Sequence, residues 1–255
     1  MIKVGTFAGS CGMGDVLMLT AVCKKTPAII ELHPKAEKYL RFFKGITEGY
    51  KITETPFTTP DVGTGLFTQT KLRYYGLPTD DHLPYVRVYP EDIEEGKRLV
   101  SQYNNPIVFV ANTANNASKE RELPQIFWQS VIDKLSKSFT ILQFGISSNF
   151  TEYKNTVPLK DLSIESLIQY YAVTGKYIGV DTGDMHLMLA VGGKCFVAYP
   201  PSPRGKEHTN WYTSHWHYNH DRINYQYVIP DTQLSQSIDT YTTKIERAFH
   251  KAEQL

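Results

Sequence analysis

Two glycine-containing turns, each followed by polar residues, are the segments of this chain best suited to chemistry. The first is Gly9-Ser-Cys-Gly-Met-Gly-Asp15, and the second is Val180-Asp-Thr-Gly-Asp-Met-His186. Each stands between an apolar run and a run with helical spacing, which predicts a strand, a turn and a helix. The N-terminus of a helix presents unpaired N–H groups and a partial positive charge, so both turns are candidates for binding an anion.

The second turn has the residue types of a phosphate site. Gly183 lets the backbone approach a phosphate closely, the Thr182 hydroxyl can add a donor, and His186 can face the same ligand from the first helical turn. A purely structural alternative has Asp181 or Thr182 capping the helix and His186 packing inside. The turn taken alone does not separate the two interpretations.

The first turn permits two kinds of chemistry. A dinucleotide site is one, because Glu31 ends the second apolar run where a ribose-binding acid is expected. Against it, the glycines are ordered G-x-x-G-x-G, and the Asp15 carboxylate would repel a pyrophosphate. In the other interpretation, Asp15 is a general base that takes a proton from an acceptor hydroxyl. The structural alternative is that Asp15 only stabilises the helix dipole.

A longer stretch around the second turn resembles the donor domain of the ADP-heptose:lipopolysaccharide heptosyltransferase family. It comprises Ser163-Ile-Glu-Ser-Leu167, Tyr177-Ile-Gly-Val-Asp-Thr-Gly-Asp-Met-His-Leu187 and Ala190-Val-Gly-Gly-Lys-Cys-Phe-Val-Ala-Tyr-Pro200. Near the start of the chain, Gly14-Asp-Val-Leu-Met-Leu-Thr20 resembles the family run that carries its catalytic aspartate. Between residues 54 and 90 the match is poor, so the resemblance implies a shortened first lobe.

The resemblance implies specific roles at the second turn. Contacts to the diphosphate of a nucleotide-sugar donor would come from Asp181, Thr182, Gly183 and His186, with Thr182 and Gly183 acting mostly through backbone N–H groups. Asp184 and Met185 occupy positions that vary in the family and receive no role. The same resemblance makes Asp15 the general base and implies inversion at the anomeric carbon.

A leaving nucleoside diphosphate gathers negative charge, which basic residues or a metal must offset. The chain has no Asp-x-Asp motif, which favours transfer without a metal or other cofactor. Residues 112–122 hold hydroxyl and basic side chains, among them Thr113, Lys119 and Arg121. In the family, a lysine precedes a Trp-Pro pair at this place. Here Arg121 stands at the position of that lysine, Lys119 lies two residues away, and Leu-Pro replaces the Trp-Pro pair. A solvated charge run is the alternative.

Residues 203–222 are rich in His, Trp and Tyr and contain Arg204. We expect this loop to contact the donor or acceptor, with aromatic faces for a base or sugar. A metal site at His215, His217 and His220 is less favoured, because their spacing fits no common site. Gly12, Gly14 and Arg204 are expected on the acceptor side or in adjoining loops.

The alternation of apolar runs and helical patterns predicts an α/β protein with parallel sheets covered by helices. The resemblance implies a fold of GT-B type, in which two Rossmann-like domains with parallel sheets face a cleft. Residues 1–104 form the expected acceptor lobe and residues 105–230 the donor lobe. A C-terminal helix at 231–255 is expected to pack back on the first lobe. The predicted strands are residues 2–7, 28–32, 50–53, 107–111, 139–144, 177–180 and 194–199.

The composition is that of a folded soluble protein, with 41% hydrophobic and 21% charged residues. A net charge of +1 gives no global electrostatic reason to bind nucleic acid. Three cysteines do not make a disulfide framework, and the chain has neither a signal peptide pattern nor an apolar run that could span a membrane. We therefore expect a cytoplasmic protein.

The sequence thus predicts a glycosyltransferase that moves a sugar from a nucleotide-diphosphate donor to an acceptor hydroxyl. Two acceptors stay open: a glycan such as the lipopolysaccharide core, and a hydroxymethylated base of phage-type DNA. Two other functions also stay open, namely a non-catalytic nucleotide-sugar-binding module and an NAD-dependent oxidoreductase using the loop from Gly9 to Gly14. The sugar, the nucleotide and the oligomeric state are not specified.

Overall fold

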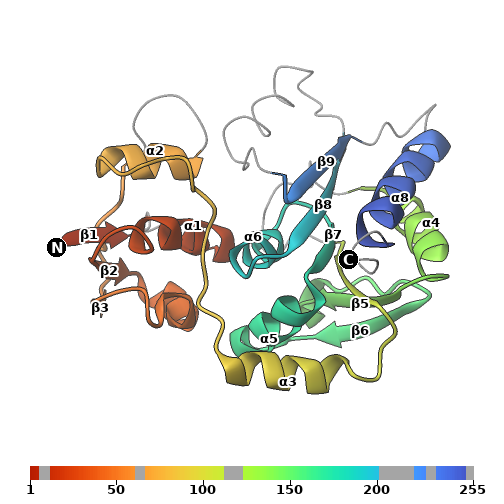
Figure 1. Cartoon of the computed structure of the whole chain (residues 1–255), viewed down its shortest axis with the longest axis horizontal. Coiled ribbons are helices and arrows are strands. Elements are labelled where there is room, and N and C mark those ends of the chain that lie inside the picture. Colours follow the sequence, from red (N-terminus) through yellow and green to blue (C-terminus); the bar gives the residue numbers. More distant parts are fainter. Residues whose placement is uncertain (6–11, 61–66, 112–122, 201–220, 228–233, 251–255) are drawn as a thin grey trace.

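Two parallel β-sheets, each covered by helices, make up the chain (Figure 1). The computed structural model describes residues 1–5, 12–60, 67–111, 123–200, 221–227 and 234–250. Both sheets are parallel throughout, because each strand is joined to the next by a crossover connection. This confirms the predicted α/β class with two parallel sheets.

The first sheet contains three strands in the order β1-β2-β3. The strands are β1 (Ile2–Gly5), β2 (Ala28–Leu32) and β3 (Gly49–Ile52). Helix α1 (Met13–Cys23) connects β1 to β2, and the 3-10 helix η1 (Pro34–Phe43) connects β2 to β3. Helix α2 (Phe67–Tyr74) follows, and α3 (Pro90–Val100) leads to the second sheet.

Helix α1 is buried on every side from Val16 to Cys23, because it lies between the first sheet and the second lobe. Its hydroxyl residue, Thr20, is fully buried as well. Thr20 donates to the carbonyl oxygen of Leu17 at 2.5 Å and accepts from the backbone N–H of Tyr85 at 2.8 Å. The helix thus keeps its buried polar group satisfied and holds the chain that leaves the first lobe.

The second sheet contains six strands in the order β6-β5-β4-β7-β8-β9. The strands are β4 (Pro106–Val110), β5 (Thr140–Gly145), β6 (Thr156–Lys160), β7 (Lys176–Gly179), β8 (Lys194–Tyr199) and β9 (Ile223–Tyr227). Helices α5 (Ile164–Thr174) and α6 (Gly183–Ala190) pack on one face. Helices α4 (Gln125–Leu135) and α8 (Leu234–His250) pack on the other, and the short η3 (Ser147–Asn149) follows β5.

Strands β6 and β9 were not among the sequence-predicted strands. Both are edge strands of the second sheet, where only one side pairs with a neighbour. Strand β6 contains Pro158, which removes a backbone donor and is tolerated only at such an edge. An edge position imposes little apolar pattern, so the sequence signal for these strands is weak.

The prediction that the C-terminal helix packs on the first lobe is wrong for its described part. The apolar side of α8, with Ile238, Tyr241, Ile245 and Phe249, joins the core formed with α4 and the second sheet. The Tyr241 hydroxyl donates to the carbonyl oxygen of Phe196 in β8 at 2.6 Å. The helix covers the sheet face that α5 and α6 leave open, so burial of its apolar side is complete within one lobe.

Helix α3 links the two lobes. A Cβ placed on Gly96 would lie 2.4 Å from the carbonyl oxygen of Gln169 in α5, so the two helices touch along their backbones. On the other side, the partly buried Arg41 of η1 pairs with the buried Asp92 of α3 at 2.5 Å. The Asp92 carboxylate also accepts from the backbone N–H of Tyr89 at 2.9 Å and so caps the helix.

The first sheet presents a buried acid near its carboxyl edge. Glu31, at the end of β2, pairs with Lys3 of β1 at 3.0 Å. Its second carboxylate oxygen accepts from the backbone N–H of Phe57 at 2.9 Å. Thr59, two residues later, exchanges hydrogen bonds with Gly5, so residues 57–59 run along the free side of β1.

No helix in the described part of the chain is long and apolar enough to cross a membrane.

Replacement of Gly96 by alanine is expected to destabilise the protein by about 1–3 kcal/mol, because the new Cβ must push α3 away from α5. A glycine-to-alanine change inside a helix otherwise stabilises by roughly 0.5–1 kcal/mol. Urea unfolding measures the difference. Gly49→Ala is the control, because no atom lies within 4 Å of a Cβ there. A Gly96→Ala protein as stable as wild type would contradict the close packing.

The Glu31 carboxylate is expected to make folding sensitive to acid. The hydrogen bonds from Lys3 and from the Phe57 backbone lower the pKa of Glu31 below its ordinary value. A lowered folded-state pKa gives stability that is present above the unfolded value and is lost as pH falls through the folded value. Wild type should therefore be more stable than Glu31→Gln at neutral pH, and the gap should close from about pH 5 to about pH 3. Urea unfolding across this range tests it. Glu94→Gln, at an exposed position on α3, is the control. A difference in stability between wild type and Glu31→Gln that does not change with pH would refute the assignment.

Candidate functional site at the junction of the two glycine turns

The N-terminal ends of α1 and α6 meet where the two lobes touch (Figure 1). A Cβ placed on Gly183 would lie 2.7 Å from the Cβ of Met13 and 3.2 Å from the backbone nitrogen of Gly14. A Cβ placed on Gly14 would lie 2.7 Å from Cδ2 of His186. Only glycine permits these approaches without displacing a neighbour. One glycine from each of the two predicted turns therefore lies in the same contact.

Asp15 lies beside this contact, in the first turn of α1. Its side chain is half-buried, and its Oδ2 is 3.1 Å from the place that a Cβ on Gly12 would occupy. The carboxylate therefore folds back over the start of its helix. Because Asp15 directly follows Gly14, which packs under the His186 ring, the structure brings the predicted base next to the second turn.

Residues 180–183 lead from β7 into α6, and we call them the phosphate turn after the phosphate site that the sequence predicts there. Asp181 and His186 are both nearly buried, at 5% and 8% exposure. Oδ1 of Asp181 lies 3.8 Å from Nε2 of His186, an ion pair when the ring is protonated. The imidazole is thus placed between Asp181 of the second lobe and Gly14 of the first.

The Thr182 side chain faces the interior rather than the junction. Its hydroxyl lies 3.2 Å from the Tyr177 hydroxyl and also hydrogen bonds to Asp184. It does not cap α6, although Thr182 is the N-cap residue. The hydroxyl is thus engaged inside the lobe, and its predicted contact with a phosphate stays a prediction that this geometry does not favour. The backbone of the turn remains the part that can meet an anion.

Two helix N-termini that face each other bring together two partial positive charges, which repel. Three carboxylates are placed at these ends: Asp15 on α1, Asp181 before α6 and Asp184 in the first turn of α6. Each offsets part of the positive potential. A bound anion at the junction would do the same.

The phosphate turn also lies at the switch point of the second sheet. From β4 the chain continues outward to β5 and β6 and then returns to β7 on the other side of β4. Ligands of open parallel sheets bind at such a point, outside the carboxyl ends of the strands. The connection after β7 is the phosphate turn. The connection after β4 is residues 112–122, which carry Thr113, Lys119 and Arg121 and lie outside the described residues.

The remaining predicted loop contacts lie outside the described residues as well. They are Arg204 and the histidines His215, His217 and His220, all within residues 201–220. Their roles stay predictions. Within the part of the chain that the structure describes, no group of three or more His, Cys, Asp or Glu side chains could hold a metal ion.

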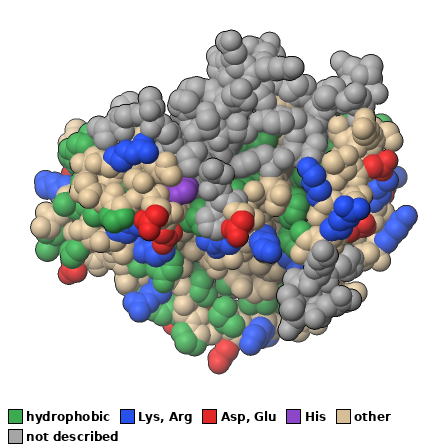
Figure 2. All heavy atoms as spheres, turned by 45° about the horizontal axis from the view of Figure 1, so that its top comes forward, with side chains coloured by type: hydrophobic (Ala, Val, Ile, Leu, Met, Phe, Trp, Pro, Cys, Tyr) green, Lys and Arg blue, Asp and Glu red, His purple; other side chains and the backbone are tan. Residues whose placement is uncertain are grey.

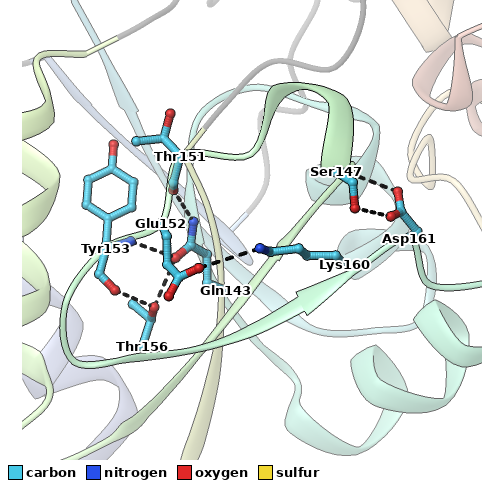
Figure 3. Close-up of polar contacts among 8 residues, drawn as sticks. All are labelled: Gln143, Ser147, Thr151, Glu152, Tyr153, Thr156, Lys160 and Asp161. Carbon is cyan, nitrogen blue, oxygen red and sulfur yellow. Dashed lines mark hydrogen bonds and ion pairs between the residues drawn. The ribbon is translucent and has the colours of Figure 1, made fainter.

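The connection from β5 to β6 borders the same edge of the sheet, and Figure 3 shows how it is fixed. The backbone N–H of Ser147, just after β5, donates to Oδ1 of Asp161, just after β6, at 3.0 Å, and the Ser147 hydroxyl bonds to the other carboxylate oxygen. Deeper in the lobe, the buried Gln143 bonds to the backbone of Thr151 and Tyr153 at 2.6 and 3.2 Å. Both ends of this connection are therefore anchored by side chains.

The dinucleotide interpretation of the first turn loses its ribose contact. Both oxygens of Glu31 are engaged, one by Lys3 and one by the backbone of Phe57. Glu31 is also only 6% exposed, which leaves little of the carboxylate open to a ribose. In addition, the Gly12–Gly14 end of α1 faces the second lobe, where Gly14 packs on His186.

Charged side chains of both signs are interspersed over the described surface on the face seen in Figure 2.

Residues that the sequence did not single out also contribute to the site. Tyr171 and Tyr177 stand in otherwise apolar segments, and their hydroxyls lie directly behind the phosphate turn. A buried tyrosine usually finds a partner for its hydroxyl, which is the only signal the sequence gave for them.

No protein-family model and no curated protein matches the chain. Solved structures do. A family 9 glycosyl transferase from Veillonella parvula aligns with a TM-score of 0.64 and 12% identity, over 99% of this chain and 96% of that one. The ADP-heptose lps heptosyltransferase II of E. coli aligns with a TM-score of 0.57 and 11% identity, over 96% and 99%.

A third similar structure is the iron-containing dodecameric glycosyltransferase TibC from enterotoxigenic E. coli. It aligns with a TM-score of 0.59 and 10% identity, over 98% of this chain and 76% of that one. Likeness at such low identity is a likeness of backbone architecture. The chain therefore has the two-lobed GT-B fold that these glycosyltransferases share.

Proposed function

We propose that this protein is a glycosyltransferase that moves a sugar from a nucleoside-diphosphate donor to an acceptor hydroxyl. The observation that carries the proposal is the meeting of the two turns: Gly14 and Asp15 from the first lobe lie against Gly183 and His186 from the second. Glycosyl transfer needs a base for the acceptor and an anion site for the leaving group, held close together. The fold it shares with known glycosyltransferases supports the same conclusion.

The donor diphosphate is assigned to the phosphate turn. The backbone N–H groups of Thr182 and Gly183 would bind its oxygens at the N-terminus of α6, where the helix dipole favours negative charge. His186, held by Asp181, would add a further donor when its ring is protonated. Gly12 and Gly14 would line the acceptor side with Asp15.

In the proposed reaction, the acceptor hydroxyl oxygen forms a bond to the anomeric carbon while the bond from that carbon to the diphosphate oxygen breaks. Asp15 takes the acceptor proton, and the nucleoside diphosphate leaves with the electron pair. A single displacement of this kind inverts the anomeric carbon. Lys119 or Arg121, which follow β4 at the switch point, would offset the charge of the leaving group without a metal.

Two classes of acceptor fit this proposal, a glycan hydroxyl and a hydroxymethylated base of phage-type DNA. A DNA acceptor requires a basic surface along the phosphate backbone. The net charge of +1 and the interspersed charges seen in Figure 2 favour the glycan. Arg204 and the aromatic residues around it would take part in either case.

Donor binding is the direct test. In a thermal-shift panel of nucleoside diphosphates and sugar nucleotides, a ligand at 100 times its dissociation constant should raise stability by about 2.7 kcal/mol. Gly183→Val should abolish the shift, because its Cβ meets Met13 at 2.7 Å and its branches would fill the anion site. Gly49→Val, at an open position, should keep it. If no member of the panel binds wild type, the donor assignment is refuted.

Replacement of Asp15 by asparagine should lower transfer by about 10²–10⁴-fold, because the amide cannot accept the acceptor proton. Donor affinity should stay close to wild type. Glu165→Gln is the matched control: Glu165 is also an acid in the first turn of a helix, so it reports the helix-dipole effect alone. Transfer measured with a bound donor and a panel of acceptors decides the matter. Unchanged transfer by Asp15→Asn would rule out this base.

The same measurements separate the other functions. A non-catalytic binding module would bind a sugar nucleotide and show no turnover with any acceptor and no slow donor hydrolysis. An NAD-dependent oxidoreductase would bind NADH, which a fluorescence titration detects. The engagement of Glu31 by Lys3 and Phe57 makes the second outcome the less favoured one.

A further inference from the structure

Behind the phosphate turn lies a network of polar side chains that the proposed chemistry does not use. Tyr171 of α5 donates to Oδ1 of Asp184 at 2.6 Å, and the Thr182 hydroxyl bonds to the same carboxylate. Tyr177 of β7 donates to the carbonyl oxygen of Val180 at 2.7 Å and lies 3.2 Å from the Thr182 hydroxyl. Both tyrosines are fully buried.

The direction of each hydrogen bond follows from counting protons. A carbonyl oxygen only accepts, so the single Tyr177 proton goes to Val180. An ionised carboxylate also only accepts, so Asp184 receives the protons of both Tyr171 and Thr182. The hydroxyl oxygens of Tyr177 and Thr182, 3.2 Å apart, are then in contact without a proton between them. Burial raises the pKa of Asp184 above its ordinary value, and the hydrogen bonds from Tyr171, its own backbone and Thr182 offset only part of this effect. The carboxylate is the acceptor on which the other members converge.

The network holds alternate residues of the turn. On the inner side, Val180 is held by Tyr177, the Thr182 hydroxyl is held by Asp184, and Asp184 is held by Tyr171. The residues between them face the other way, since Asp181 approaches His186 and Gly183 approaches Met13. The Tyr171 ring is itself stacked on Phe144 of β5, with centroids 5.4 Å apart and planes at 13°. The backbone of the turn is thus held from a rigid support.

We propose that Asp184 is a positioning residue for diphosphate binding, acting through Tyr171 and Thr182 to hold the backbone N–H groups of the phosphate turn in place. The inference rests on the proposed donor site, because the diphosphate is what the turn would bind. It assigns a role to a position that the sequence left without one. Hydrogen bonds that fix a binding group before the ligand arrives reduce the ordering that binding requires.

Variants of Asp184 and Tyr171 separate the effect of the Asp184 charge on binding from its effect on the position of the turn. The Asp184 charge by itself would repel a diphosphate, so a variant without the charge should bind better if charge alone mattered. Asp184→Asn loses the charge and keeps an oxygen that accepts from Tyr171. Asp184→Ala loses both, and Tyr171→Phe leaves the carboxylate and removes its partner. Tyr170→Phe is the matched control, since Tyr170 is the next residue on α5 and also packs on Phe144.

The experiment measures the dissociation constants of inorganic pyrophosphate and of ADP by calorimetry, at a temperature where circular dichroism shows each variant folded. Pyrophosphate probes the turn without a nucleoside. We expect Asp184→Ala and Tyr171→Phe each to weaken both ligands by about tenfold or more, the effect of losing a hydrogen bond to a charged group. For Asp184→Asn, both dissociation constants should stay within about threefold of wild type, because the asparagine side chain keeps an oxygen that accepts from Tyr171. The double variant of Tyr171→Phe and Asp184→Ala should be no weaker than Asp184→Ala alone.

Each outcome decides between the claims. If wild type binds neither probe nor any other nucleoside diphosphate, the proposed donor site fails, and the role of Asp184 in it fails too. If wild type binds and Tyr171→Phe binds equally well, the positioning role alone is overturned. The same holds if Asp184→Ala binds tighter than wild type, or if Tyr170→Phe weakens binding as much as Tyr171→Phe. Should Asp184→Ala not fold, the Tyr171→Phe and Tyr170→Phe pair still decides.

Discussion

The contact of Gly14 with His186 and of Gly183 with Met13 is the constraint on which the arrangement of this protein depends. Each glycine removes the side chain that would otherwise keep α1 and α6 apart. Around the contact, one apolar core continues from the first sheet through α1 to α5, α6 and the second sheet. The two lobes are therefore packed on each other through helix ends rather than joined only by the chain that runs between them.

Bringing two helix N-termini together is electrostatically unfavourable, and acidic residues on both sides of the junction offset part of this cost. Asp15 and Asp181 lie at the junction itself, while Asp184 is turned inward to Tyr171. The division matters for function. An acid at the junction can exchange a proton or orient an imidazole, whereas an acid held behind the turn shapes the backbone without occupying the space of a ligand. We regard this separation of roles as the organising feature of the site.

A second link, away from the junction, fixes the angle between the lobes. Gly96 lets α3 rest on the backbone of α5, and the largely buried Arg41–Asp92 pair ties α3 to η1 of the first lobe. Breaking a buried pair by removing one partner leaves an uncompensated charge, so both links resist separation of the lobes. Relative motion of the lobes would have to disturb a packed helix pair, an ion pair and the glycine contacts together.

The sequence by itself determined the parallel α/β class, the strands of strong apolar pattern and the second turn, because these depend on local periodicity and on glycine. It did not reveal edge strands β6 and β9, whose pairing on one side only leaves little pattern, and it misplaced α8. It also left the Thr182 hydroxyl open to a ligand and gave Asp184 no part. Only the tertiary structure decided these points, because the partners that turn both side chains inward, Tyr171 and Tyr177, come from other elements of the fold.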